Sequence, residues 1–132
     1  MNVFFDVDYT ILGWDYTLRP HTRSVFEQLG ALGHDVHVWS GVGDRTEDLE
    51  KHELIHLVKG VYKKPLANFG IGLQTFGVPV VPDFVIDDYP EIVEHFGGLL
   101  ITPYWNKAYA NDDLTKVPPM VEELQRLRCR LS

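Results

Sequence analysis

Two apolar runs in this chain each end on carboxylates, and this pattern limits the available folds more than any other feature. Val3-Phe4-Phe5 leads into Asp6 and Asp8, and Phe84-Val85-Ile86 leads into Asp87-Asp88. Short, uniformly apolar runs are typical of buried parallel strands, and open α/β sheets bind ligands at the carboxyl ends of such strands. If the two strands are neighbours, all four carboxylates meet in one crevice.

Carboxylates gathered in this way need a cation. Two unit charges about 4 Å apart repel by roughly 4 kcal/mol at an effective dielectric constant near 20. A hard divalent ion with oxygen ligands relieves this repulsion, and Mg²⁺ fits that description best. The sequence therefore predicts a magnesium site at the strand ends.

Strand and helix patterns alternate along the chain. About five strands are expected, at residues 2–7, 36–39, 57–62, 83–87 and 99–101. Helices are expected at 20–33, from 44 to about 56, at 65–76, from 90 and after 119. This order predicts an α/β, three-layer Rossmann-like fold with a mainly parallel sheet, in one domain spanning residues 1–132.

Several helix features follow from local patterns. Asp44 and Glu47 have the spacing of a capping box. Two helices should each present one apolar stripe, made by Val25, Phe26, Leu29 and Leu32 in the first and by Val121, Leu124, Leu127 and Leu131 in the last. Trp39 and Phe84 are assigned to the core.

Composition excludes some classes of function. The formal net charge of -7 disfavours nonspecific binding to nucleic acids or to anionic membranes. A single cysteine, Cys129, excludes an intrachain disulfide. No apolar run approaches the length of a membrane span and no basic leader is evident, so we expect a cytoplasmic protein.

Other groups suited to phosphate chemistry follow in a fixed order. The chain contains hydrophobic-Asp-x-Asp-x-Thr at residues 6–10, hydrophobic-Ser at Ser40, a lysine at Lys64 before an expected helix, and hydrophobic-Asp-Asp at residues 87–88. Through these four motifs, roughly residues 2–101 resemble the haloacid dehalogenase-like (HAD) superfamily of hydrolases.

The resemblance implies a phosphatase mechanism. Asp6 would attack phosphorus and form an aspartyl-phosphate, which divides one difficult displacement into two easier steps. Asp8 would protonate the leaving oxygen and then activate water. Dehalogenases of the superfamily lack this second Asp, so its presence favours phosphate esters as substrates.

The resemblance also implies the groups that hold metal and phosphate. Mg²⁺ would be bound by the Asp6 carboxylate, by the main-chain carbonyl of Asp8, and by the pair Asp87 and Asp88. Either member of that pair could be the direct ligand. Ser40 and Lys64 would clamp the phosphoryl oxygens, where charge accumulates. Lys63 competes with Lys64 for this role.

Short intervals between the motifs leave no room for a cap domain. Residues 10–36 and 40–64 each hold about one helix, so the crevice should be open. An open crevice suits large or macromolecular phosphorylated substrates, or a lid supplied by self-association into a homo-oligomer. The aromatic loop Trp14 to Tyr16, with Arg19, is the expected substrate contact.

Three other classes of protein share parts of this pattern. His52-Glu53-Leu54-Ile55-His56 matches the zinc-peptidase pattern H-E-x-x-H, but Lys59 and Tyr62 stand where one class of these enzymes carries Gly and His. We interpret this segment as an exposed helix face. A response-regulator receiver is disfavoured because its acid pair comes first in the chain. A catalytically silent HAD-like phosphate-binding protein has the same motifs as an enzyme.

Overall fold

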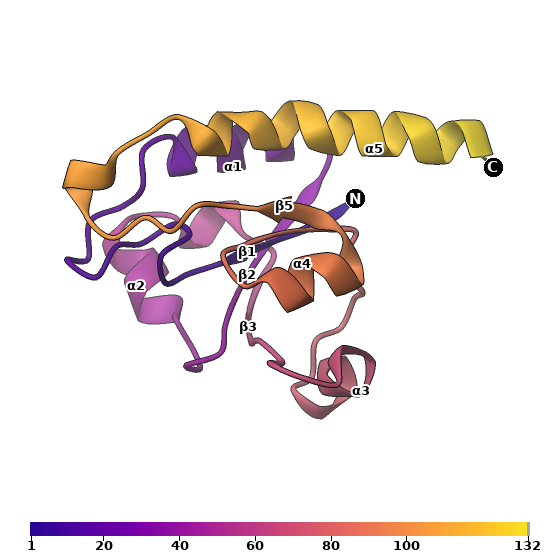
Figure 1. Ribbon diagram of the computed structural model, residues 1–132, viewed down its shortest axis with the longest axis horizontal. Coiled ribbons are helices and arrows are strands. Elements are labelled where there is room, and N and C mark those ends of the chain that lie inside the picture. Colours follow the sequence, from indigo (N-terminus) through magenta and orange to yellow (C-terminus); the bar gives the residue numbers. More distant parts are fainter. Residues whose placement is uncertain (132) are drawn as a thin grey trace.

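A parallel sheet with the strand order β3-β2-β1-β4-β5 forms the centre of the protein (Figure 1). The computed structural model describes residues 1–131. Its strands are β1 (Asn2–Asp6), β2 (Asp35–Ser40), β3 (Gly60–Lys63), β4 (Phe84–Asp87) and β5 (Gly98–Leu100). Every neighbouring pair is parallel. The predicted α/β fold with a five-stranded sheet is confirmed.

Helices cover both faces of this sheet, which gives three layers (Figure 1). The α-helices are α1 (Thr22–Ala31), α2 (Thr46–Lys51), α3 (Phe69–Thr75), α4 (Pro90–Phe96) and α5 (Val117–Leu131). Short 3₁₀ turns are η1 (Ile55–Leu57), η2 (Lys107–Tyr109) and η3 (Asp113–Lys116). Helices α1 and α5 contact one another and lie over one face, while α4 packs on β4 and β5 from the other.

Alternation along the strands divides the apolar residues between two cores. Val3 and Phe5 of β1 face the α1 side, where they join Phe26 in a buried cluster. Phe4 faces the opposite side and packs with Trp39, and Ile92 of α4 completes that cluster. Trp39 and Phe84 are both buried, as predicted. The central strand β1 is therefore buried on both faces, which explains its continuous apolar sequence.

The helix predicted from Asp44 to about His56 is wrong in its length. Helix α2 ends at Lys51 because Glu53 adopts a left-handed conformation (φ 56°), which turns the chain so that Leu54 enters the core. The predicted capping box is wrong, because the N-cap residue of α2 is Arg45 and its side chain makes no capping hydrogen bond. Asp44 Oδ1 accepts hydrogen bonds from the Thr46 amide at 3.0 Å and hydroxyl at 2.6 Å, but Glu47 pairs with Lys51 instead.

Three further helix boundaries differ from prediction. The helix expected from Pro65 begins at Phe69, because Pro65 packs against Gly72 and Asn68 turns left-handed (φ 49°). In the first helix, Leu32 is exposed and lies beyond the last helical residue. The last helix begins at Val117 and so includes Pro118-Pro119 in its first turn, where proline's missing amide is tolerated.

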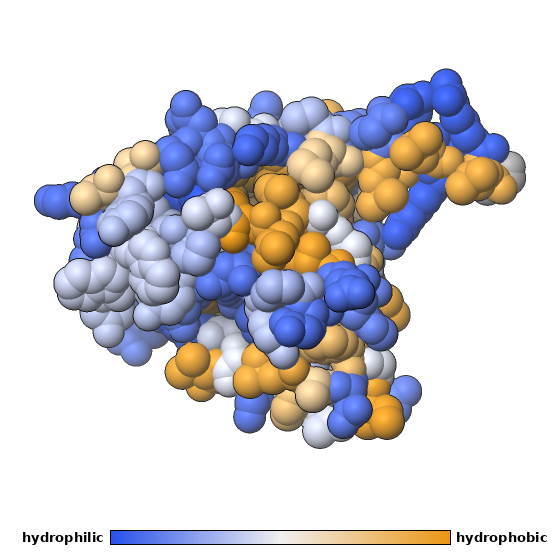
Figure 2. Space-filling view, viewed as in Figure 1, coloured by the Kyte–Doolittle hydropathy of each residue, from blue (hydrophilic) through white to orange (hydrophobic). Residues whose placement is uncertain are grey.

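Helix α5 extends past the edge of the sheet (Figure 1). Val121 is buried and Leu124 is partly buried, but Leu127 and Leu131 are exposed on the projecting part. Figure 2 shows the resulting apolar surface along α5 and over β5. Within residues 1–131, no helix combines the length and the apolar character needed to cross a membrane.

Gly98 allows β5 to pair with β4. It lies opposite Val85 at φ +149°, and a Cβ atom there would fall 1.9 Å from the Val85 carbonyl oxygen. No side chain fits this approach without backbone movement. The pairing with β5 also holds β4 in position, and with it Asp87, the last residue of β4.

We therefore expect Gly98→Ala to lower the free energy of unfolding by about 2 kcal/mol or more, through strain and lost strand pairing. Gly30→Ala is the matched control, because Gly30 is exposed in α1 with open space around it. This control should raise the free energy of unfolding by about 0.5–1 kcal/mol. Urea unfolding of both variants measures the difference, and equal stabilities would contradict the prediction.

Candidate functional site

The site lies at the carboxyl edge of the sheet, where the topology brings distant residues together. Strand β1 lies between β2 and β4, so Asp6 ends the central strand with Ser40 on one side and Asp87 on the other. Ser40 is opposite Lys63 in the next strand pair. The two acid-terminated strands, β1 and β4, are neighbours, which fulfils the condition set in the sequence analysis.

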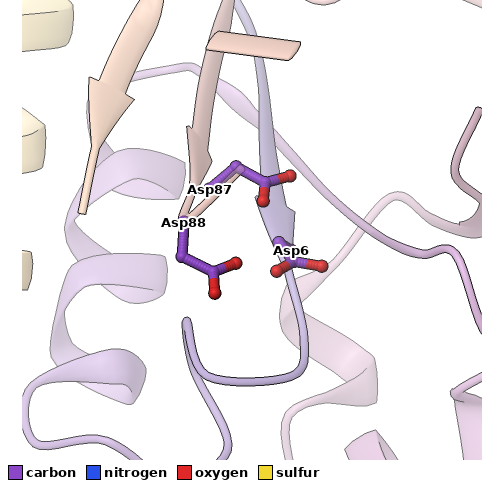
Figure 3. A group of neighbouring side chains, drawn as sticks. All are labelled: Asp6, Asp87 and Asp88. Carbon is purple, nitrogen blue, oxygen red and sulfur yellow. The ribbon is translucent and has the colours of Figure 1, made fainter. Parts of the chain in front are cut away.

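Three carboxylates gather at this edge (Figure 3). One oxygen from each of Asp6, Asp87 and Asp88 lies within 4.8 Å of the others. Asp6 and Asp87 are buried and Asp88 is half-buried. Within residues 1–131, no other group of three acidic, histidine or cysteine side chains is close enough to hold a metal ion.

Lys64 joins the carboxylates. Its Nζ atom donates hydrogen bonds to Asp6 Oδ1 at 2.9 Å and to Asp87 Oδ2 at 3.0 Å, and its side chain is buried. Lys63 instead lies over the Phe76 ring, with its ammonium 4.8 Å from the ring centroid. Of the two lysines that the sequence left open, Lys64 is the one at the site.

Burial and the close approach of the charged groups shift the pKa values of Asp6, Asp87 and Lys64. Burial raises the pKa of Asp6 well above its ordinary value, and the charge of Asp87 raises it further, while Lys64 acts in the opposite direction. Burial also raises the pKa of Asp87, again against the effect of Lys64. For Lys64, attraction to both carboxylates outweighs burial, so its pKa is raised. The lysine stays charged, yet one ammonium does not balance three carboxylates.

Neighbouring groups fix the orientation of the buried carboxylates. Thr10 Oγ1 donates a hydrogen bond to Asp6 Oδ2 at 3.1 Å, and the Tyr89 amide donates one to Asp87 Oδ1 at 3.0 Å. The Lys64 amide bonds the Ser40 carbonyl at 2.9 Å, which places the lysine beside the end of β2. Thr10 therefore helps to fix the orientation of the Asp6 carboxylate.

Asp8 is separate from this cluster. Its Oδ2 atom accepts a hydrogen bond at 2.7 Å from Nη1 of Arg45. The same Nη1 atom lies 3.3 Å from Ser40 Oγ, and Arg45 Nε donates to Asp48 Oδ2 at 2.6 Å. Sequence reasoning missed Arg45, because an arginine beside a helix start matches no motif and its partners become visible only in the fold.

A cleft of about 660 Å³ opens beside Asp8 and Arg45. Trp14 and Tyr16 line it and are exposed. Their contact with a substrate stays a prediction. The other lining residues are Tyr9, Gly13, Val42, Asp44, Glu47, Asp48 and Lys51. The three clustered carboxylates do not line this cleft, so Asp8 is the proposed catalytic residue that faces it.

Arg19, predicted to contact substrate together with this loop, is instead 1% exposed. Its Nη1 atom donates to the Thr10 carbonyl at 3.3 Å, and Nη2 reaches Asn111 Oδ1 at 3.1 Å and Asp113 Oδ2 at 3.4 Å. The guanidinium therefore ties the loop after β1 to the segment before α5. The prediction is wrong because those distant acceptors draw the side chain inward.

The H-E-x-x-H pattern does not form a zinc-binding helix turn. His52 follows the last residue of α2, Glu53 is left-handed, and His56 lies in the separate turn η1. His52 Nε2 is 3.1 Å from the Tyr16 carbonyl oxygen. The expected exposed helix face is therefore also wrong.

Comparison with known proteins assigns no family, because no protein-family model matches the sequence and a search of curated proteins finds no significant match. Fold and site together define an α/β protein with a lysine-bridged acidic centre at the carboxyl edge of a parallel sheet.

The raised pKa of Asp6 means that its ionised form costs folding free energy, since the folded state binds the proton more tightly than the unfolded chain. We therefore expect Asp6→Asn to stabilise the metal-free protein at neutral pH by about 1 kcal/mol, as is common when a strained functional site is relieved. Urea unfolding in EDTA measures this effect.

The control for this experiment is Asp35→Asn, because Asp35 is an exposed carboxylate whose only ion pair in the described structure, to Lys59 at 3.6 Å, is on the surface. Its stability should change little, since exposed pairs contribute about 0–1 kcal/mol. An Asp6→Asn variant less stable than wild type in EDTA would show that the Lys64 pair outweighs the burial cost.

Proposed function

We propose that this protein is a magnesium-dependent phosphomonoester hydrolase of the HAD-like type without a cap domain. The observation that carries the proposal is the placement of Lys64 between Asp6 and Asp87, at 2.9 and 3.0 Å, beside Asp88. Carboxylates can supply a nucleophile and metal ligands, and a buried ammonium can supply positive charge to phosphoryl oxygens.

The carboxylate oxygens of Asp6, Asp87 and Asp88 are of the ligand type that Mg²⁺ prefers, and they lie slightly farther apart than oxygens bound to one ion. Mg²⁺ takes oxygen ligands at about 2.0–2.1 Å, so two oxygens on one ion are at most about 4.2 Å apart. The oxygens of Asp6, Asp87 and Asp88 lie within 4.8 Å of one another, so small side-chain rotations would bring them into range. When bound, the ion would supply positive charge opposite the phosphoryl group.

The acidic pair divides into two roles in this proposal. Asp87 uses one oxygen for Lys64 and the other for the Tyr89 amide. Asp88 is half-buried and its carboxylate makes no hydrogen bond or ion pair with other side chains of residues 1–131. We therefore assign direct metal contact to Asp88, while Asp87 holds Lys64. The Asp6 carboxylate and the main-chain carbonyl of Asp8 are the further ligands that the resemblance implies.

Hydrolysis would take place in two displacements. An Asp6 carboxylate oxygen attacks phosphorus, the bond to the alcohol oxygen breaks, and Asp8 donates a proton to that oxygen. This gives an aspartyl-phosphate and a free alcohol. Asp8, now ionised, accepts a proton from a water molecule that attacks phosphorus, which restores Asp6 and releases inorganic phosphate. Lys64 and Ser40 would hold the phosphoryl oxygens throughout.

Access to the site bears on the substrate. Loops and short helices alone connect β1 to β2 and β2 to β3 within the described chain, so no folded lid covers the carboxyl edge. We propose a phosphorylated substrate, large or macromolecular, that contacts the exposed Trp14 and Tyr16. A lid contributed by a second copy of the chain and a cytoplasmic location remain predictions from the sequence.

Hydrolysis of 4-nitrophenyl phosphate by the purified protein, with Mg²⁺ and with EDTA, tests the proposal. We expect activity that needs Mg²⁺ and falls at least about a thousandfold in Asp6→Asn, as is usual when a nucleophile is removed. Asp35→Asn should match the wild type. Activity that survives Asp6→Asn contradicts the nucleophile assignment. Binding of inorganic phosphate without turnover of any phosphomonoester would identify the silent binder instead.

Asp8→Asn should separate metal binding from turnover. The proposed metal contact at this position is a main-chain carbonyl, so Mg²⁺ affinity measured by calorimetry should stay close to that of the wild type. Turnover should fall by about 10²–10⁴-fold, the usual contribution of a general acid and base. A variant that keeps the full rate would refute the role of Asp8.

A further inference from the structure

Arg45 holds the carboxylate of Asp8 in one orientation at the mouth of the cleft. We infer that Arg45 is a positioning residue that directs Asp8 toward the oxygen of the leaving group; this inference rests on the proposed phosphatase function. Arg45 lies on the loop before α2, far from Asp8 in the sequence, and its side chain is 11% exposed.

The guanidinium is fixed from two sides. Nη1 donates to Asp8 Oδ2 at 2.7 Å, and Nε donates to Asp48 Oδ2 at 2.6 Å. Distances of this kind are typical of charge-assisted hydrogen bonds, and a planar guanidinium held at two points has little freedom to turn. Asp48 on α2 therefore anchors Arg45, and Arg45 in turn anchors Asp8.

Asp8 depends on this contact. Its side chain is 39% exposed, and Arg45 is its only hydrogen-bond or ion-pair partner within the part of the chain that the structure describes. Without that partner, the carboxylate could rotate among several orientations above the cleft. Arg45 contacts Oδ2, so Oδ1 is the oxygen left to carry the proton. A proton donor must lie within hydrogen-bond reach of the oxygen it protonates, so a single orientation of Oδ1 favours transfer.

A competing role is direct binding of phosphate by Arg45, since Nη1 lies 3.3 Å from Ser40 Oγ. The two roles differ in their dependence on the leaving group. Phosphate contacts are the same for every phosphomonoester, so their loss slows all substrates by one factor. Loss of a positioned acid slows chiefly those substrates whose leaving oxygen needs a proton.

Two substrates of similar size distinguish these roles. Phenol has a pKa of about 10, like tyrosine, and its departure is assisted by a proton, whereas 4-nitrophenolate is a much weaker base and leaves with little assistance. The kcat/KM value reports the loss of transition-state stabilisation relative to free enzyme and substrate. In the proposed reaction it covers departure of the alcohol and leaves out hydrolysis of the aspartyl-phosphate.

The experiment measures kcat/KM with Mg²⁺ for phenyl phosphate and 4-nitrophenyl phosphate in wild type, Arg45→Ala, Arg45→Lys, Asp48→Asn and Lys51→Ala. We expect Arg45→Ala to lower the value for phenyl phosphate about tenfold more than for 4-nitrophenyl phosphate, a part of what general acid catalysis contributes. Arg45→Lys should restore little of this difference, because an ammonium lacks the guanidinium fork. Asp48→Asn should shift the ratio in the same direction.

Lys51→Ala is the matched charge control. Lys51 lines the same cleft but pairs with Glu47 at 3.7 Å and makes no contact with Asp8. Its removal should change both substrates by the same factor. Asp48→Asn leaves residue 45 an arginine and removes only the charge that anchors it. This variant therefore also tests the inference if Arg45→Ala fails to fold, which circular dichroism would reveal.

The outcomes separate this inference from the function on which it rests. Equal loss for both substrates in Arg45→Ala and Asp48→Asn overturns the positioning role and indicates phosphate binding. Unchanged values for both substrates overturn any role for Arg45. A wild-type protein that hydrolyses neither substrate refutes the proposed function itself, and this inference falls with it.

Discussion

Repulsion among the carboxylates of Asp6, Asp87 and Asp88 is the constraint on which the carboxyl edge of the sheet depends. Three negative charges within 4.8 Å of one another, two of them buried, would open this edge without a cation. Lys64 supplies that cation in the structure, and the loop that carries it is fixed by its amide bond to the Ser40 carbonyl. Lys64 therefore links the ends of β1 and β4 through its ammonium group and the end of β2 through its amide.

Two largely buried arginines, Arg19 and Arg45, hold the loop after β1 in place. Arg19 bonds the Thr10 carbonyl and reaches Asp113, while Arg45 bonds Asp8 and reaches Asp48. The loop is thus held between two guanidinium groups. Arg19 is paired with the distant Asp113, and Arg45 is paired with Asp48 three residues along the chain. Arg19 Nε remains without a hydrogen-bond partner in the described structure, so this anchoring carries a desolvation cost.

Sequence and structure agree where the chemistry is local and repetitive. Apolar runs that end on Asp6 and Asp87 predicted both strands. Their adjacency was only a condition in the sequence analysis, and the pairing of β1 with β4 fulfils it. Arg45 was not predictable, since its role depends on Asp8, which lies 37 residues away in the sequence and is brought to it only by the fold. The length of α2 could not be predicted from the sequence either. The helix ends where the chain turns to bury Leu54, and burial depends on the whole fold.

Asp6 and Asp87 lie far apart in the sequence, at the ends of β1 and β4. Strand β1 is made first, but its site edge is completed only when β4 pairs with it, after the whole β1-to-β3 half of the chain has been passed. Contacts between residues so far apart in the sequence are slow to form, because the intervening chain must lose entropy before they stabilise anything. The acidic centre therefore carries the entropic cost of closing the chain between Asp6 and Asp87, a cost that the pairing of β1 with β4 has to offset.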